Sequence, residues 1–427
     1  MSKLVIAVEK RSSIQWIGEI YCLVLLLLPN AVIQATSIYT RTTPATIWYK
    51  YTSFYFSALI IPAIFWALLI RKRTNALRFD FVIVAIILKD LLMLLIPTFK
   101  QFVDYNFSFN LILISGWSIV SIVFSFAKQD DTDSVERFLD VYFILAVLSQ
   151  LLRLTLRLST DGRYGAIGLS VGGTGYFDGV FLIYCLYHRE FTNRVVAYMI
   201  FAFISLVLSG QRSNILFVLI FCIPYILNRL TGKVSKIEGR RFLLIWYAAG
   251  LGVLLISTIL ILDDLGIKIR GIQFITRTID AFELLMEGDI STEFSVKGRL
   301  LSLAAGFDIL KNNIFGITNN FYELQYRMLQ HAYPTFPHNT LLCCYLLWSP
   351  FITFFCFIYL TKTVVSAFRV RSGMLWPILY IYLYNIITGS VFLDYPYFVV
   401  NLYFISLAKC KIEQNFSEGQ LQDEFEE

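Results

Sequence analysis

The stretch Val195–Leu230, VVAYMIFAFISLVLSGQRSNILFVLIFCIPYILNRL, contains two apolar runs that only Ser209-Gly210-Gln211-Arg212-Ser213 separates. Apolar runs of this kind form helices that cross a lipid bilayer, and the short polar interval leaves room for a single tight turn. We therefore predict two membrane helices joined by a very tight hairpin, with Arg212 at its tip.

The rest of the chain has the same character. Of its 427 residues, 57% are hydrophobic and 15% are charged, and the mean hydropathy is +0.66. Soluble domains carry about a quarter charged residues, so an ordinary soluble protein is excluded. Backbone groups within a bilayer must be satisfied internally, which predicts an all-α polytopic integral membrane protein of about twelve transmembrane helices. The predicted spans are Ile14–Ile33, Tyr49–Ile70, Phe79–Pro97, Phe107–Phe126, Phe138–Leu156, Tyr176–Tyr187, Val195–Ser209, Asn214–Leu230, Phe242–Leu262, Thr340–Leu360, Met374–Val391 and Pro396–Ala408.

Basic residues collect in alternate short loops, which hold 21 of the 36 Lys and Arg residues. The positive-inside rule places these loops and both termini in the cytoplasm. The first span follows Lys10-Arg11 without a small-residue cleavage site after it, which predicts a retained signal-anchor. The net charge of +6 reflects this topology and gives no indication of nucleic-acid binding.

The topology divides the chain into four parts: helices one to nine in residues 1–262, a large outward loop in 263–338, helices ten to twelve in 339–412, and an acidic cytoplasmic tail in 413–427. The outward loop holds nine acidic and seven basic residues and two of the three histidines. Within it, apolar residues recur at helical spacing in 272–282 and again at Leu300, Leu303, Phe307 and Leu310. We expect both segments to be amphipathic helices on the bundle or on the membrane surface.

Arginines on the outer side are candidate ligands for an anion. The planar guanidinium of Arg212 suits a pyrophosphate, although an interfacial arginine also simply extends toward lipid headgroups. Ser209 and Gly210 beside it are small enough to let an anion approach the backbone. Arg153 and Arg157 are four residues apart and should share one helix face. Arg163 follows in a glycine-rich loop that either folds around a ligand or forms a flexible turn.

The end of the outward loop offers a candidate base. His338 lies between Pro337 and Asn339 at the start of a span, and a neutral imidazole there accepts a proton from a hydroxyl group. A lone histidine is more often structural. Further candidates are Arg277 and Arg299 on the loop helices, and Tyr322 and Tyr326, whose rings could stack on sugars or pack ordinarily.

Lys89 and Asp90 fall in the middle of the third predicted span. Charged residues at this depth face the bundle interior. A structural network is the favoured interpretation, and a proton or ion pathway, which would imply a transporter, is the alternative.

Three features, in this order, resemble the bacterial O-antigen polymerase (Wzy-type) and O-antigen ligase family. They are the Ser-Gly-Gln-Arg-Ser hairpin, the stretch from Arg299 to Gly316, and the His338-Asn339 helix start. The chain departs from the family in having Lys311–Gly316 where Asn-Pro and then Gly are frequent. It also has Trp348-Ser349-Pro350 where a helical glycine is expected, which weakens a ligase assignment.

The resemblance implies a metal-independent glycosyltransferase without a cofactor, located in the bacterial inner membrane. It implies a polyprenyl-pyrophosphate-linked oligosaccharide as donor and another as acceptor, with the bilayer around them and a chain-length regulator protein as a possible partner. His338, Arg212 and Arg299 would then be catalytic, and Arg153, Arg157, Arg163, Arg277, Asn339, Tyr322 and Tyr326 would bind substrate. The expected activity is O-antigen polymerisation in lipopolysaccharide biosynthesis. The alternatives are an O-antigen ligase, which transfers glycan to lipid A-core, and a polysaccharide-repeat flippase.

Overall fold

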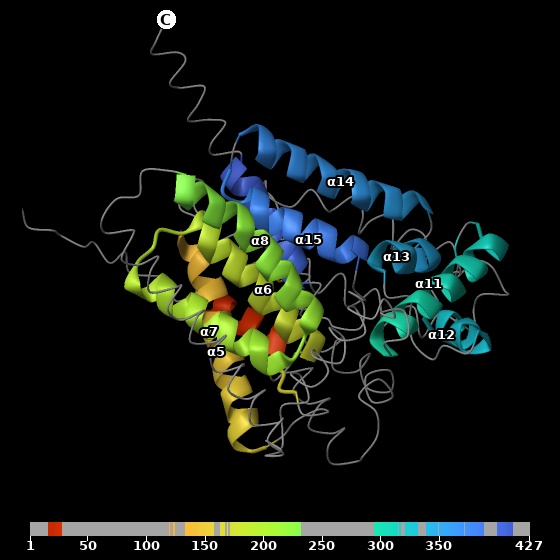
Figure 1. Ribbon diagram of the computed structural model, residues 1–427, viewed down its shortest axis with the longest axis horizontal. Coiled ribbons are helices and arrows are strands. Elements are labelled where there is room, and N and C mark those ends of the chain that lie inside the picture. Colours follow the sequence, from red (N-terminus) through yellow and green to blue (C-terminus); the bar gives the residue numbers. More distant parts are fainter. Residues whose placement is uncertain are drawn as a thin grey trace, which may run out of the picture.

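The computed structural model describes residues 16–27, 119, 123, 133–157, 163–166, 169, 171–231, 294–314, 316, 321–331, 339–348, 350–370, 372–387 and 399–412. The regular secondary structure in these residues is helical, as the all-α prediction requires. The labelled helices are α5 Asp133–Thr155, α6 Val171–His188, α7 Asn193–Ser209, α8 Arg212–Thr231, α11 Phe294–Asn312, α12 Phe321–Gln330, α13 Thr340–Trp348, α14 Pro350–Arg369 and α15 Leu375–Ile387 (Figure 1).

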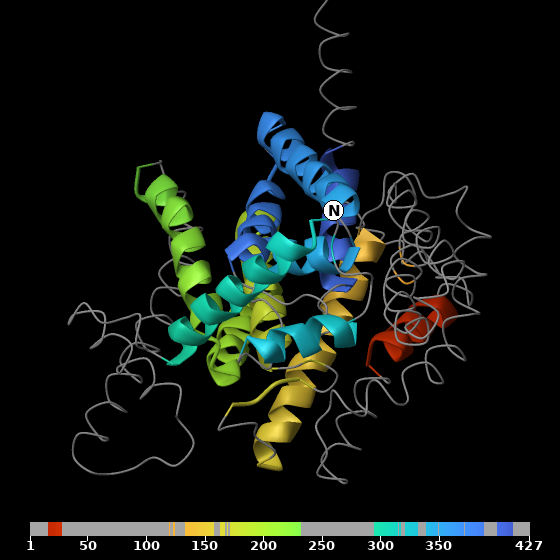
Figure 2. The same ribbon diagram turned by 90° about the vertical axis from the view of Figure 1, so that its right-hand side faces the viewer.

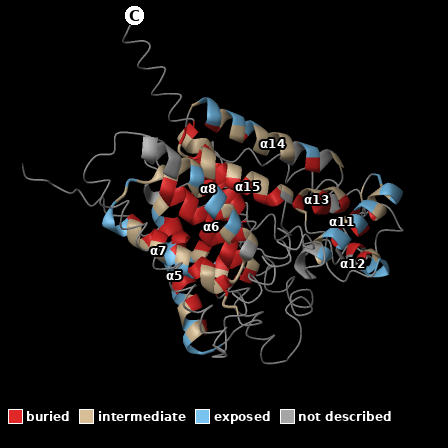
Figure 3. Cartoon of the chain, in the orientation of Figure 1, coloured by how far each residue is buried: buried red, intermediate tan, exposed pale blue. Residues whose placement is uncertain are grey.

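Helix α6 forms the centre of the bundle. Fifteen of its 18 residues are buried, and it packs against α7, α8 and α15. Figure 3 shows the buried residues gathered around α6, while α14 and α11 carry exposed residues. A helix that is buried on nearly every side is apolar on nearly every side, which explains why the sequence of α6 shows no amphipathic stripe. On the outside of the bundle, Leu148, Ile204 and Leu219 are exposed, as expected of side chains that face lipid.

One helix in the described residues, Val135–Thr155, is long and apolar enough to cross a membrane by length and composition. Shorter apolar helices are Trp16–Leu27, Asn193–Ser209, Ser213–Tyr225 and Leu375–Ile386. The predicted number of spans therefore stays a prediction. The spans predicted at 49–70, 79–97 and 242–262, the Lys89-Asp90 pair and the acidic tail lie outside the described residues.

Two predicted boundaries are wrong. The sixth span was predicted to begin at Tyr176, but α6 begins at Val171, so Gly172, Gly173 and Gly175 belong to a helix and not to a loop. The predicted continuous span Thr340–Leu360 is divided into α13 and α14. Its break falls at Pro350, which lacks an N–H group and disfavours helical conformation in the residue before it.

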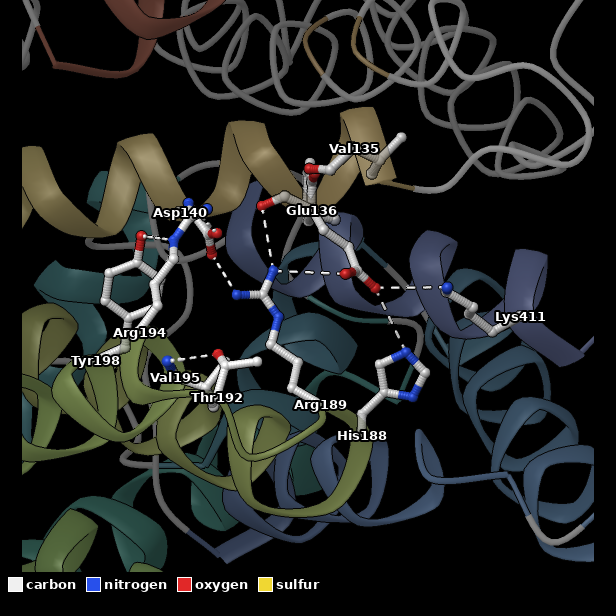
Figure 4. Close-up of polar contacts among 11 residues, drawn as sticks. Val135, Glu136, Asp140, His188, Arg189, Thr192, Arg194, Val195, Tyr198 and Lys411 are labelled. Carbon is white, nitrogen blue, oxygen red and sulfur yellow. Dashed lines mark hydrogen bonds and ion pairs between the residues drawn. The ribbon is translucent and has the colours of Figure 1, made fainter. Parts of the chain in front are cut away.

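A charged cluster lies at one end of the bundle, where α5 begins, α6 ends and α7 begins (Figure 4). Arg189 binds Asp140 at 2.6 Å, and Arg194 binds the second oxygen of that carboxylate at 2.9 Å. The carboxylate of Glu136 lies 3.5 Å from His188 Nε2 and 3.5 Å from Lys411 Nζ. The arginines and the lysine of this cluster were all predicted on the same side of the membrane. Arg153 is in the last turn of α5, at the end of this helix away from the charged cluster.

Candidate functional site

The predicted hairpin between α7 and α8 is present. Gly210 caps α7 in the left-handed conformation, with φ 64° and ψ 24°, and its N–H donates to the carbonyl of Val207. Glycine adopts this conformation without a steric penalty, which is why it follows so many helices. Helix α8 begins at Arg212, only two residues later. Arg212 is thereby held at a helix N-terminus, where unpaired N–H groups favour an anion.

The hairpin packs tightly against α6. A Cβ atom placed on Gly175 would lie 2.6 Å from Ser209 Oγ, 2.9 Å from Gln211 Cβ and 3.1 Å from Asn214 Nδ2. Ser209 is fully buried, and its hydroxyl donates to the carbonyl of Leu206 at 2.6 Å. The expectation that Ser209 leaves room for an anion beside the backbone is therefore wrong, because α6 occupies that side of the hairpin.

The glycine-rich segment after α5 is fixed to the bundle where it is described. Gln150 donates to the carbonyls of Tyr164 at 2.8 Å and Ser205 at 3.0 Å, and the N–H of Tyr164 donates to Leu208. Arg153 is buried and donates from NH1 to the carbonyl of Gly165 at 3.2 Å. A freely flexible turn does not describe residues 163–166.

Arg153 and Arg157 do not share a helix face. Helix α5 ends at Thr155, and Arg157 has a positive φ of 54°, which turns the chain away from the helix axis. Arg157 is exposed, whereas Arg153 is buried. The i, i+4 argument fails because it assumed that the helix continued through Arg157. The two guanidinium groups therefore have different surroundings, and Arg163 is half-buried beside the same end of the bundle.

Asn339 caps the helix that follows the outward loop. Its side-chain oxygen accepts from the N–H of Leu342 at 2.9 Å, which satisfies one of the N-terminal donors of α13. Its side-chain amide donates to the carbonyl of Ile386 near the end of α15. Both polar groups of this side chain are thus engaged within the protein, which favours a positioning role over direct contact with a sugar.

Helices α11, α12 and α13 lie together beside the main bundle (Figure 1). Gly316, in the turn after α11, has a positive φ of 86°, and an added Cβ would lie 2.7 Å from the carbonyl oxygen of Tyr345. The hydroxyl of Tyr345 donates to Ile314 at 2.7 Å, and Arg327 donates to Asn313 at 3.0 Å. The contacts with Tyr345 fasten the turn to α13, and the bond from Arg327 fastens it to α12, so the helix that carries Arg299 is tied to the helix that Asn339 caps.

The predicted apolar stripe of α11 is exposed at two of its four residues and half-buried at Leu303 and Leu310. Leu300 and Phe307 are 53% and 52% exposed, whereas Ser302, Ala305 and Ile309 are buried. The small side chains of Ser302 and Ala305 let α11 approach its neighbours closely, while Leu300 and Phe307 face outward. In Figure 2, α11 and α12 (teal and cyan) lie across the middle of the view, in front of the bundle. Arg299 lies half-buried near the start of α11.

Tyr326 is 60% exposed on α12, so its ring is accessible. Lys311 donates to Asp308 at 2.9 Å, and this hydrogen bond lowers the pKa of the exposed Asp308 carboxyl. Among the described residues, no three His, Cys, Asp or Glu side chains are grouped so as to hold a metal ion. His338 and Arg277, with the side chains of Arg212 and Tyr322, lie outside what the structure describes.

The sequence interpretation missed a buried polar network around α15. Tyr380 donates to Asn214 at 3.2 Å, Thr340 donates to Asn385 at 3.2 Å, and Tyr176 donates to Asn401. All of these side chains are buried. The available signal was an asparagine and alternating tyrosines inside an apolar helix, because polar side chains are rare within a bilayer unless they have a role.

The described part of the chain thus defines an all-helical bundle with an arginine hairpin and an asparagine-capped helix joined to it at one end. Residues 197–345 match the family model described as O-antigen ligase. This match supports the predicted resemblance to the O-antigen polymerase and ligase family, whose proteins are integral membrane proteins. It covers Arg212, Arg277, Arg299, His338 and Asn339 but not the arginines at 153, 157 and 163. The search of curated proteins found no match to this chain.

Proposed function

We propose that this protein is an O-antigen polymerase, which joins polyprenyl-pyrophosphate-linked oligosaccharide repeats at the outer face of the bacterial inner membrane. The observation that carries the proposal is that two segments resembling family motifs, the arginine hairpin and the helix start at Asn339, both lie against helix α15. The arginine hairpin at α8 and the helix start at Asn339 both contact α15, through Tyr380 on one side and Ile386 on the other. A proposed leaving-group site and a proposed base would therefore share one end of the bundle.

The proposed reaction is a single glycosyl transfer. A hydroxyl oxygen of the acceptor repeat attacks the anomeric carbon of the donor, and the bond from that carbon to the lipid pyrophosphate breaks. The hydroxyl proton passes to His338, and the electron pair of the broken bond leaves with the pyrophosphate. A pyrophosphate is weakly basic, so positive charge stabilises its departure more than protonation does.

The arginines would supply that charge without a metal ion. Arg212 is placed at the N-terminus of α8, where the helix dipole adds partial positive charge. Arg299 would approach from α11, and Arg157 is exposed at the same end of the bundle as the hairpin. Asn339 would fix the start of α13 and with it the backbone next to His338. Tyr326 presents an accessible ring for a sugar face.

Basic loops support the proposed orientation. Arg189, Arg194 and Lys411 meet at the end of the bundle that the positive-inside rule assigns to the cytoplasm. The hairpin would then face outward, away from nucleotide sugars, which agrees with a lipid-linked donor. Both termini would be cytoplasmic, and a separate membrane protein could set the chain length.

An O-antigen ligase is the second candidate, since the matching family model carries that description. It would use the same donor but a lipid A-core acceptor. The break between α13 and α14 at Pro350 favours the polymerase, because a ligase-like sequence is expected to have a helical glycine in this region.

A genetic experiment separates the candidates. In a polymerase, deletion of the gene leaves one repeat attached to lipid A-core; in a ligase, deletion removes every repeat. We expect His338→Ala and Arg212→Ala to give the one-repeat form while the proteins remain in the membrane at normal abundance. Long ladders from both variants would refute the assignment of these residues, and loss of all repeats would favour the ligase.

A further inference from the structure

Helix α15 touches the two halves of the candidate site on different sides. It packs against α8, which begins at the arginine hairpin, and against α13, which begins after His338. On the first side, the hydroxyl of Tyr380 donates to Asn214 Oδ1 at 3.2 Å. Asn214 and Tyr380 are both fully buried, and Asn214 is only two residues beyond Arg212.

On the second side, two neighbouring bonds hold the start of α13. Thr340 Oγ1 donates to Asn385 Oδ1 at 3.2 Å, and Asn339 donates to the carbonyl of Ile386. Asn385 also donates to Ile381 at 2.7 Å within its own helix, which fixes its side-chain orientation. The first turn of α13 is thus bound to the last turn of α15 by side chains that belong to both helices.

Stacked rings make the connection between the two sides stiff. The rings of Tyr380 and Tyr384 have centroids 5.9 Å apart and an interplanar angle of 4°. Tyr176 of α6 lies 4.7 Å from Tyr384, and Phe217 of α8 lies 5.6 Å from it. Tyr380 and Tyr384 are buried, so a rotation of either ring would displace several packed neighbours.

We propose that α15 is a brace for catalysis, in which Tyr380 and Asn385 are positioning residues that fix the Arg212 hairpin relative to the start of the His338 helix. The inference rests on the proposed function, because the brace matters only if the Arg212 hairpin and His338 act on the same substrate. Neither side chain touches the reacting atoms. Tyr380 acts through Asn214, and Asn385 acts through Thr340.

Physical chemistry favours this purpose over simple stabilisation. Polar groups buried in an apolar bundle add little net stability, but they are costly when unpaired, so they select one relative arrangement of helices. A catalytic geometry demands such selection, because a displacement of about 1 Å can cost about a hundredfold in rate. An apolar α15 could hold the bundle together without fixing the position of the Arg212 hairpin relative to the start of α13.

Two substitutions test the brace by removing one hydroxyl each. Tyr380→Phe removes the donor to Asn214, and Thr340→Val removes the donor to Asn385. Their matched controls are Tyr187→Phe, which removes a hydroxyl that donates to Phe221 of α8 at 2.6 Å, and Thr363→Val in α14. Each control makes the same chemical change at a hydroxyl that does not take part in the brace.

The full-length proteins are purified and supplied with polyprenyl-pyrophosphate-linked repeat units isolated from a strain that lacks this protein. We expect kcat to fall about five- to tenfold in each brace variant, with KM within about twofold, which is the effect of one lost hydrogen bond on geometry. The controls should keep wild-type kcat. Thermal unfolding midpoints are measured for all four, and brace and control variants should shift to a similar degree.

Two results would overturn the brace. One is wild-type kcat in both brace variants, and the other is an equal loss of kcat in the controls, which would indicate a general effect of lost packing. His338→Ala is assayed beside them. If it is inactive while the brace variants are fully active, only the brace fails; if it too keeps full activity, the proposed function fails.

Discussion

Gly175 offers a way to move the arginine hairpin without changing any proposed catalytic group. A methyl group on this residue would lie 2.6 Å from Ser209 Oγ, 2.9 Å from Gln211 Cβ and 3.1 Å from Asn214 Nδ2. Ordinary contacts to a carbon atom are about 3.5–4.0 Å, so the hairpin must move away from α6 by about 1 Å. We therefore predict that Gly175→Ala displaces Arg212 relative to the rest of the site.

The cost in stability should be small because two effects oppose each other. Alanine in a helix interior is favoured over glycine by about 1 kcal/mol. Overpacking of a tight site costs about 1–3 kcal/mol. The net destabilisation should therefore lie between about 0 and 2 kcal/mol, while a shift of about 1 Å at a catalytic group lowers activity by about a hundredfold.

Gly373→Ala is the matched control. A Cβ atom there would lie 2.6 Å from the carbonyl oxygen of Tyr187, which is just as close, but at the end of the bundle that holds the charged cluster. Both variants are purified in detergent, and their unfolding midpoints are compared with their turnover of lipid-linked repeats. We expect Gly175→Ala to lose turnover per folded molecule and Gly373→Ala to keep it.

The reasoning is refuted if Gly175→Ala polymerises at the wild-type rate, because the hairpin position would then be unimportant. It is also refuted if both variants lose turnover in proportion to their loss of folded protein. The second outcome would mean that the contact between α6 and the hairpin serves stability alone.

Three further substitutions test other parts of the structure. Gly316→Ala combines a positive φ with a Cβ contact of 2.7 Å to Tyr345 O, so it should destabilise the turn by about 2–4 kcal/mol and make the α11–α12 segment more sensitive to limited proteolysis. Arg157→Gly relieves a positive φ of 54° and should leave the unfolding midpoint unchanged or slightly raised, so that lost polymerisation in this variant reports the guanidinium group. Asp140→Asn removes the carboxylate that Arg189, 10% exposed, binds at 2.6 Å, and leaves Arg189 with its longer contact to Glu136 at 3.6 Å. This variant should lose about 2 kcal/mol of stability in thermal unfolding.

Local chemistry made the hairpin predictable from the sequence. Two apolar runs, a glycine and a five-residue polar interval allow few arrangements, and the structure has the helix end at Ser209 and the new start at Arg212. The all-helical class was predictable for the same reason, since an apolar backbone must satisfy its own hydrogen bonds. The start at Thr340 was also predicted correctly from the apolar run, and the structure shows that Asn339 caps the helix there.

Tertiary contacts decided what the sequence interpretation got wrong. The glycines at 172, 173 and 175 were expected in a loop, but close packing with α7 and α8 needs small residues inside α6. The sequence left open whether the apolar side chains of α11 face the bundle or the membrane surface, and in the structure Ser302, Ala305 and Ile309 are its buried residues. Spacing within one segment cannot predict which face a neighbouring helix will cover.

The pairings within the polar network around α15 could not be predicted for a related reason. Tyr380 binds a partner 166 positions away, and Asn385 binds one 45 positions away. A single sequence carries no signal for such pairings. The candidate arginines, by contrast, were visible as charges in an apolar chain, although only a structure could separate the buried Arg153 from the exposed Arg157.

Polymerisation by purified components tests the proposed function most directly. The wild-type protein in liposomes is given polyprenyl-pyrophosphate-linked repeats together with a metal chelator, and product length is followed on gels. We predict ladders of several repeats from the wild type, and none from Arg212→Ala or His338→Ala at equal folded amounts. Ladders from these variants, or a wild type that forms product only when lipid A-core is supplied, would contradict the proposed polymerase.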